Sequence, residues 1–287
     1  MLADKDIMID NALIKKIETA AQQVRKKCLD IAFGMSPKAT HFGGALSSVD
    51  ILSTLYFEVM NYDVNNPTWE NRDRFFMSKG HSVMGYYATL AKVGFITDEE
   101  LHSYGQNETF LPGHPVINKS KGIESTNGSL GMGLSVGIGN ALAAKKKNLS
   151  YKSYVLMGDG ECNEGSVWEA VMAAPHFKLD NLIAIVDRNS FQQTGAGSDI
   201  MEIGDLRDKF SSFGWHAVEI NGHNVADIIM ALNEDNTGKP KAIIAKTIKG
   251  KGFSFSEGNN AWHHAVLTKK LYSLGLTECG GDPNADK

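Results

Sequence analysis

Two oxygen-bearing side chains follow two apolar stretches of this sequence. Asp159 lies in a glycine-flanked "GDG" directly after "YKSYVLM", and Asn189 follows "NLIAIVD". Residues 161–188 leave room for one helix and a returning strand, so we expect both side chains at the same edge of a parallel sheet. A carboxylate, an amide oxygen and a nearby main-chain carbonyl suit a hard divalent cation such as Mg²⁺ or Ca²⁺.

The residues around Asp159 also favour an anion. Gly158 and Gly160 allow the backbone to approach a ligand closely. A helix expected to begin near Glu164 directs its free N–H groups and positive dipole end to the same edge. A cation next to an anion site indicates a diphosphate. A tight turn after a strand would also explain "GDG" alone, but not the asparagine at the end of the following strand.

The rest of the chain predicts the elements that position these residues. Near-period-3.6 or apolar segments predict helices near 10–34, 48–60, up to 93, from 97, from 128, at 164–174, 205–212 and 224–233, and strands near 75–77, 152–157, 181–187, 215–220 and 241–247. Strands that are almost entirely apolar are covered on both faces. The alternation predicts an α/β fold with a doubly wound, mostly parallel sheet flanked by helices. We expect one domain over residues 1–287, with a less ordered tail from about 277.

Composition narrows the function classes. The 287 residues carry a net charge of −4, which argues against a nucleic-acid partner. The amino terminus does not resemble a signal peptide, and no apolar run reaches the roughly 18 residues of a membrane helix, so we expect no membrane association. Three widely spaced cysteines indicate neither a disulfide framework nor a zinc site, and we expect a cytoplasmic protein.

Further motifs accompany "GDG" and Asn189 along the chain. They are "THFGGALSSVDIL" (40–52), "RDRFFMSKGHSVMGYY" (72–87), "LPGHP" (111–115), "ESTNGSLGMGLSVGIGNALA" (124–143) and "FGWHAVEINGHN" (213–224). In this order they resemble the amino-terminal half of the transketolase family, from about residue 12 to about 270. The resemblance implies a thiamine diphosphate-binding domain and transfer of a two-carbon ketol unit from a ketose or its phosphate to an aldose or its phosphate.

The resemblance also implies roles for individual residues. Asp159, Asn189 and the main-chain oxygen of Phe191 would hold Mg²⁺, with Ca²⁺ or Mn²⁺ as possible substitutes. The residues that would contact the cofactor are Gly158, Gly160, His81 and His263 at the diphosphate, Gly128 and Leu130 at the rings, Asn189 through the metal, and Glu164, which links to the activating acid across a subunit interface.

Histidines are the candidates for proton transfer. His41, His114 and His263 match family histidines near the reaction, and a neutral imidazole with a pKa near 6.5 can both donate and accept protons around pH 7. Two departures accompany them: Phe42 stands where the family often has proline, and His264 follows His263 where the family usually has glycine. The other histidines, His102, His176, His216 and His223, are interpreted as structural or surface residues.

One required part of the family's active site is not found in this sequence. The family activates its cofactor with a glutamate from a second, pyrimidine-binding domain, and the chain ends at Lys287. The chain therefore resembles the amino-terminal subunit of a split transketolase. We expect a separate carboxy-terminal transketolase subunit, with the active site at the interface, and a heterotetramer of two plus two.

Three other functions are weighed against this one. "GSLGMGLSVGIG" resembles a dinucleotide fingerprint, but no apolar strand precedes Gly131, which disfavours nicotinamide binding. The thiamine-binding subunit of a 2-oxoacid dehydrogenase also carries "GDG" and a following asparagine. A non-catalytic binding half is the third alternative. The paired "KGHS" and "PGHP" loops favour the transketolase interpretation.

Overall fold

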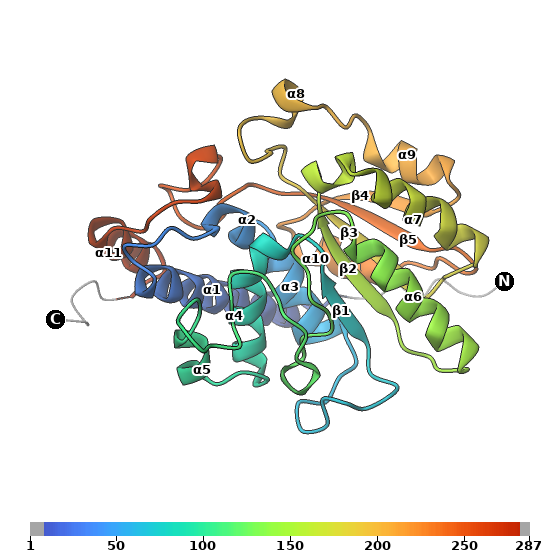
Figure 1. The fold of residues 1–287 in the computed structure, drawn as a ribbon, viewed down its shortest axis with the longest axis horizontal. Coiled ribbons are helices and arrows are strands. Elements are labelled where there is room, and N and C mark those ends of the chain that lie inside the picture. The colour runs from blue at the N-terminus through green and yellow to red at the C-terminus, as the bar shows by residue number, and fades with distance from the viewer. Residues whose placement is uncertain (1–8, 282–287) are drawn as a thin grey trace.

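The computed structural model describes residues 9–281 and shows five parallel strands in one sheet. The strands are β1 (Arg74–Met77), β2 (Ser153–Gly158), β3 (Leu182–Arg188), β4 (His216–Asn221) and β5 (Lys241–Lys246). Their spatial order is β1-β2-β3-β5-β4, and each neighbouring pair is parallel (Figure 1). The predicted α/β fold with a doubly wound parallel sheet is confirmed.

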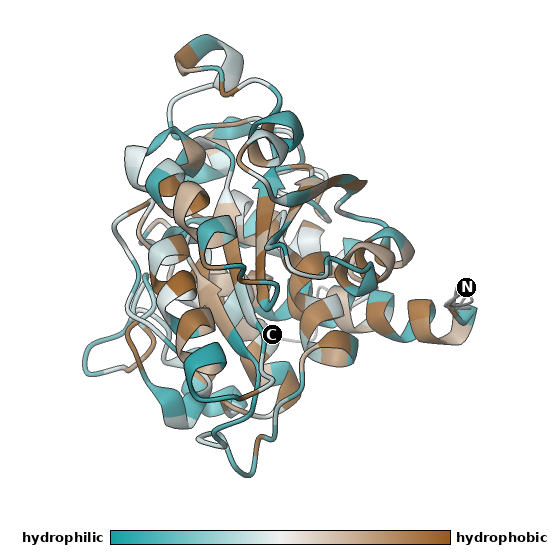
Figure 2. Ribbon diagram, turned by 90° about the vertical axis from the view of Figure 1, so that its right-hand side faces the viewer, coloured by the Kyte–Doolittle hydropathy of each residue, from teal (hydrophilic) through white to brown (hydrophobic). Residues whose placement is uncertain are grey.

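Helices cover both faces of the sheet (Figure 1). One face carries α6 (Gly133–Lys146), α7 (Gly165–His176) and α9 (Leu206–Ser212), and the other carries α1 (Asn11–Gly34), α3 (Val49–Thr54), α4 (Val83–Val93) and α10 (Val225–Asn233). Consecutive strand residues point to opposite faces, so Val155 packs in the core with α6 and α7 while Leu156 packs in the core with α1, α3 and α4. The apolar strands therefore lie between two apolar helix layers (Figure 2).

Capping side chains explain where several helices begin. The Asp10 carboxylate accepts the Ala12 N–H at 3.0 Å at the start of α1. Thr97 and Glu100 form a reciprocal capping box at α5 (Asp98–His102). Each such cap satisfies backbone donors that would otherwise lack partners, and stabilises its helix by about 1 kcal/mol.

Two predicted helices differ from the observed ones. The expected helix at 48–60 is interrupted: α2 (Phe42–Leu46) ends before Ser47, α3 follows, and residues Leu55–Val59 form a π-helical turn. The Ser47 and Ser48 hydroxyls donate to carbonyls three residues earlier, which competes with regular helix bonding. The glycine-rich helix begins at Gly133 instead of 128, because Gly131 has a φ of +85°.

The carboxy-terminal part of the described chain adds a helix that the sequence analysis did not predict. Helix α11 (Lys269–Glu278) packs on α1, where Gly275 lies against Leu29. Of the tail expected from about 277, residues 282–287 lie outside the described residues. A further short helix is α8 (Gly197–Ile200). Between residues 9 and 281, no helix has both the length and the apolarity needed to cross a membrane.

Candidate active site

A cavity of about 380 Å³ opens at the carboxyl-terminal edge of the sheet, where ligands bind in parallel α/β folds. Strands β1, β2, β3 and β5 and the loops that follow them deliver its walls. All site residues predicted from the sequence line it: His41, His81, His114, Gly128, Leu130, Gly158, Asp159, Gly160, Glu164, Asn189, Phe191 and His263. The structure thus gathers segments separated by more than 200 residues into one site.

Asp159 and Asn189 lie on neighbouring strand ends, as predicted. The Asp159 carboxylate accepts the N–H of Gly160 at 2.9 Å and that of Ser190 at 2.6 Å, and Asn189 Oδ1 accepts the Phe191 N–H at 3.1 Å. Burial, together with the charge of Asp187, raises the pKa of Asp159 to about 6. A buried carboxylate that is bonded only to backbone N–H groups of the described chain is a suitable ligand for a bound cation.

The donor set at this point is limited but chemically consistent. Among residues 9–281, no group of three or more His, Cys, Asp or Glu side chains is arranged to hold a metal. A site here would combine the Asp159 carboxylate with the Asn189 amide oxygen and the Phe191 carbonyl, an all-oxygen set of the kind that Mg²⁺ accepts together with water and phosphate oxygens. The predicted ligands therefore fit a hard cation.

Asp187, two residues before Asn189, belongs to a different interaction. Its carboxylate is fully buried and pairs with the Lys79 ammonium, while the Ser47 hydroxyl donates to it at 2.6 Å and the Thr247 hydroxyl also bonds to it. Burial opposes ionisation, but Lys79 and the two hydroxyls bring the pKa of Asp187 below its usual value. This carboxylate is already neutralised. Lys79 also lines the cavity, a role that the sequence analysis missed although the residue lies in "SKGHS".

Glu161 organises the loops around the diphosphate side of the cavity. This buried carboxylate accepts the N–H groups of Gly131 at 2.9 Å and Gly158 at 3.1 Å, and the Ser78 hydroxyl also donates to it. Burial raises its pKa despite these bonds. Glu161 thereby joins the ends of β1 and β2 to the loop before α6. The sequence analysis passed over it because an acid beside "GDG" has no pattern of its own.

Four of the predicted histidines meet in the cavity. The His41 ring lies 5.4 Å from that of His81, 6.0 Å from that of His114 and 5.5 Å from that of His263, measured between centroids. His41 immediately precedes α2, whereas His81 and His263 lie in single 3₁₀ turns. Gly44 allows close approach of the His81 loop, since an added Cβ there would lie 2.9 Å from the Ser82 hydroxyl.

These imidazoles are held in the neutral form. Burial is the main cause that lowers the pKa of His41 to about 4, followed by the charges of His264 and His114. Burial and then Lys249 lower the pKa of His263 to about 4, and burial and then Lys79 lower that of His81 to about 2. At neutral pH each ring therefore presents one nitrogen as acceptor and one N–H as donor.

Lys249 is a second cavity residue that sequence reasoning missed. It follows β5 in "IKGKG", is 2% exposed, and its ammonium donates to Asn260 Oδ1 at 2.6 Å and lies 3.1 Å from His263 Nδ1. Burial, and secondly Lys79, lower the pKa of Lys249 to about 8. Two buried ammonium groups thus face a cavity that also contains Asp159. A search for cations in glycine-flanked loops would have found Lys249.

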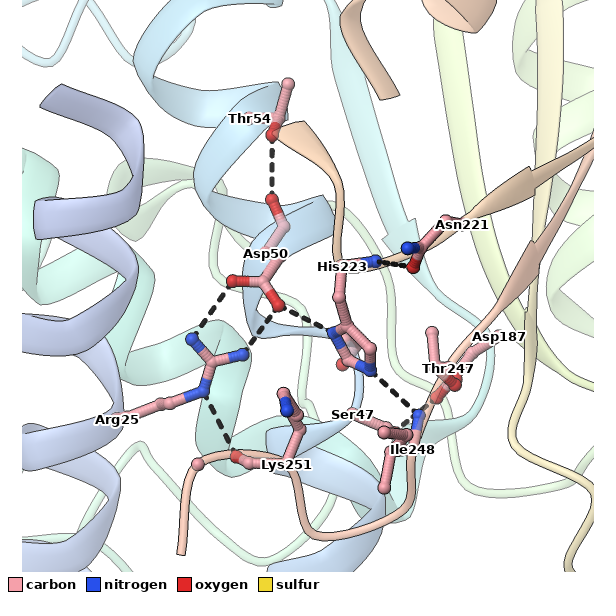
Figure 3. A network of polar contacts seen from close by, with 12 residues as sticks. Arg25, Ser47, Asp50, Thr54, Asp187, Asn221, His223, Thr247, Ile248 and Lys251 are labelled. Atoms are coloured by element: carbon pink, nitrogen blue, oxygen red, sulfur yellow. Dashed lines mark hydrogen bonds and ion pairs between the residues drawn. The ribbon is translucent and has the colours of Figure 1, made fainter. Parts of the chain in front are cut away.

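A polar network behind the cavity holds the segment that carries Lys249 (Figure 3). Arg25 donates to both oxygens of Asp50, at 3.0 and 2.6 Å, and Asp50 also accepts from His223 Nδ1 at 2.7 Å. His223 Nε2 accepts the Ile248 N–H at 2.8 Å, so Nδ1 carries the proton. The residue interpreted as structural is confirmed to have both ring nitrogens bonded within the protein.

The Phe42 departure has a packing consequence. Phe42 is fully buried, with its ring centroid 5.7 Å from Phe253, 6.2 Å from Phe255 and 5.5 Å from Trp262. This aromatic cluster attaches the His41 loop to the segment that carries His263. The ring thus takes over, through packing, the position where a proline would restrict the backbone.

Glu164, Gly128 and Leu130 lie at the open side of the cavity. Glu164 is exposed at the N-cap of α7, and its side chain approaches Gly131 in the loop before α6. Gly128 faces His114, with 3.8 Å between the position of an added Cβ and the imidazole. An exposed carboxylate at the mouth of the cavity is accessible to a second polypeptide.

Comparison with known proteins gives a consistent result. Residues 18–286 match the family model described as transketolase, thiamine diphosphate binding domain. The first of the two subunits of apulose-4-phosphate transketolase from Phocaeicola vulgatus is 44% identical over 267 residues, covering 92% of this chain and 94% of that protein. A 6-deoxy-6-sulfo-D-fructose transketolase subunit of a Clostridium species is 42% identical over 240 residues, covering 83% of this chain and 87% of that protein.

Longer relatives match over only part of their length. Transketolase of Homo sapiens is 38% identical over 232 residues, which are 80% of this chain and 37% of that protein. The structure of transketolase from Leishmania mexicana superimposes with a TM-score of 0.85 and 31% identity, covering 93% of this chain and 42% of that one. The chain therefore matches nearly the full length of the P. vulgatus protein but only about two-fifths of the longer ones.

Proposed function

Because this chain belongs to the transketolase family through its thiamine diphosphate binding domain, we propose that it is the amino-terminal subunit of a two-chain transketolase. It transfers a two-carbon ketol unit from a ketose or its phosphate to an aldose or its phosphate. The observation that carries the proposal is the convergence of Asp159, Asn189 and the cavity histidines on one cavity at the carboxyl edge of the sheet.

In the proposed site, Asp159, Asn189 and the Phe191 carbonyl hold Mg²⁺ at the end of β2 and β3. The diphosphate lies beside Gly158, Gly160 and His81, where the buried ammonium groups of Lys79 and Lys249 offset its charge. Gly128 and Leu130 contact the rings. When bound, thiamine diphosphate supplies the carbon nucleophile that attacks the ketose carbonyl.

The cavity histidines move the protons that accompany this attack. A neutral imidazole N–H of His41 or His114 protonates the developing alkoxide oxygen of the sugar. The acceptor nitrogen of a second imidazole takes the proton from the neighbouring hydroxyl as the C–C bond breaks. His263, whose Nδ1 faces the Lys249 ammonium, carries its own proton on Nε2 and donates from there.

A second chain completes the proposed enzyme. Two relatives that are themselves single subunits of apulose-4-phosphate transketolases match more than nine-tenths of this chain. The partner is a carboxy-terminal transketolase subunit that brings the activating glutamate to Glu164. A two-plus-two heterotetramer places each active site between unlike chains. We further propose that this assembly works in the cytoplasm, as the cysteine pattern led us to expect.

Reconstitution tests the proposal. The partner is produced from the neighbouring reading frame of transketolase carboxy-terminal type, and xylulose 5-phosphate is mixed with ribose 5-phosphate, Mg²⁺ and thiamine diphosphate. We expect ketol transfer with both chains together and none with either alone, and a mass near that of two plus two by light scattering. Transfer by the chain alone would refute the two-chain assignment.

The alternative dehydrogenase function is not favoured, because the matched family is transketolase over residues 18–286. The same reconstitution separates it, since a 2-oxoacid dehydrogenase would decarboxylate pyruvate and would not use xylulose 5-phosphate. A non-catalytic half would bind thiamine diphosphate in calorimetry with the partner and yet give no turnover with either donor.

A further inference from the structure

A further imidazole lies directly beside the cavity. The His264 ring centroid is 4.5 Å from that of His41, a shorter separation than the 5.4 to 6.0 Å between His41 and the cavity histidines His81, His114 and His263. His264 is exposed, whereas His41 is half-buried. His264 therefore extends the histidine cluster from the cavity toward solvent.

The backbone fixes this arrangement. The Thr40 N–H donates to the Ala265 carbonyl at 2.9 Å, and the Ala265 N–H donates to the Thr40 carbonyl at 3.1 Å, which forms an antiparallel bridge. In such a pairing the next residues, His41 and His264, lie opposite each other with neighbouring side chains. A glycine at position 264, as the family usually has, would leave this side of His41 open.

The ring nitrogens of His264 are available to a ligand. Within the described part of the chain, no hydrogen bond or ion pair involves the His264 side chain, whereas both nitrogens of His223 are bonded and His263 Nδ1 faces Lys249. A donor and an acceptor nitrogen therefore stand on the solvent side of a proposed proton-transfer residue. A sugar hydroxyl is the substrate group that uses both functions.

We propose that His264 is a specificity-determining residue, whose imidazole hydrogen-bonds a hydroxyl of the sugar substrate beyond the two carbons that react. This inference rests on the proposed transketolase function. Since His41 faces the reacting carbons, its outer neighbour is one step farther along the sugar. Loss of one such bond lowers kcat/KM by about tenfold.

The test varies both the side chain and the length of the acceptor. The assembled two-chain enzyme carries His264→Ala, His264→Gln, which keeps an N–H, or His264→Phe, which keeps a ring against His41. His176→Ala is the matched control, because His176 is an exposed histidine on α7 that does not line the cavity. The acceptors are ribose 5-phosphate, ribose and glycolaldehyde, with xylulose 5-phosphate as a constant donor.

We expect His264→Ala and His264→Phe to lower kcat/KM for both ribose acceptors by about tenfold through KM, with glycolaldehyde within about twofold, because the short acceptor has no distal hydroxyl. His264→Gln should recover part of the loss. Equal losses for all three acceptors, or wild-type behaviour of His264→Phe, would show that the ring only packs on His41. A loss confined to ribose 5-phosphate would overturn the hydroxyl assignment in favour of the phosphate.

These outcomes are separate from those of the proposed function. If the wild-type assembly transfers no ketol unit at all, the function is refuted and the role of His264 with it. If the wild type is active and the His264 variants match His176→Ala with every acceptor, only the role of His264 is refuted.

Discussion

The buried ion pair between Lys79 and Asp187 allows a quantitative test of how the cavity floor is built. The exposed fractions of the two side chains are 2% and 0%, and the Lys79 ammonium also donates to the Gly44 carbonyl at 2.9 Å. Lys79→Met removes the cation and keeps the length of the side chain. Asp187→Asn removes the anion and keeps a group that can bond to the Ser47 and Thr247 hydroxyls.

Each single substitution should lower the free energy of unfolding by about 3–5 kcal/mol, because it leaves the other charge buried without its partner. The double substitution removes both charges and should cost no more than either single one. The interaction energy from the cycle should therefore reach about 3 kcal/mol, at the upper end of the range for residues in contact.

Urea unfolding of the purified chain at pH 8, followed by circular dichroism, measures these values from the midpoint and slope. Lys147 and Glu70 provide the matched control, since their 2.8 Å ion pair joins side chains that are 61% and 63% exposed. The same kind of cycle there should give an interaction energy below about 1 kcal/mol. Additive losses at Lys79 and Asp187 would refute the argument that each charge depends on the other.

Three further predictions concern the candidate site. The pKa of Asp159 rises from 3.8 to about 6 in the folded chain, so its contribution to stability is present below about pH 4 and is lost as the pH rises through about 6. Asp159→Asn should therefore unfold at higher urea than the metal-free wild type at pH 8, by at most about 3 kcal/mol, and this advantage should disappear near pH 4. In the assembled enzyme, Asp159→Ala should lose thiamine diphosphate on gel filtration in Mg²⁺; retained cofactor and full activity without excess metal would contradict the ligand assignment. His114→Ala should retain the cofactor and lower kcat by about 10²-fold or more, which steady-state kinetics and calorimetry together can check.

The sequence by itself determined the edge of the sheet at which the site lies. Asp159 and Asn189 each follow an apolar strand, and in a parallel sheet both strands must end at the same edge. The same local logic predicted the strands and most of the helices, because periodicity and caps act over a few residues. The family resemblance then supplied His41, His114 and His263, which the structure places around the same cavity.

The tertiary structure alone decided how the charges in that cavity are distributed. Asp187 and Asp159 are two carboxylates near the ends of neighbouring strands, and only the position of Lys79 shows which of them is already neutralised. Glu161 and Lys249 depend in the same way on partners from distant segments. The pairing of Thr40 with Ala265, which sets His264 beside His41, joins residues more than 200 positions apart. Such contacts are determined by packing between elements, and no local pattern of residues records them.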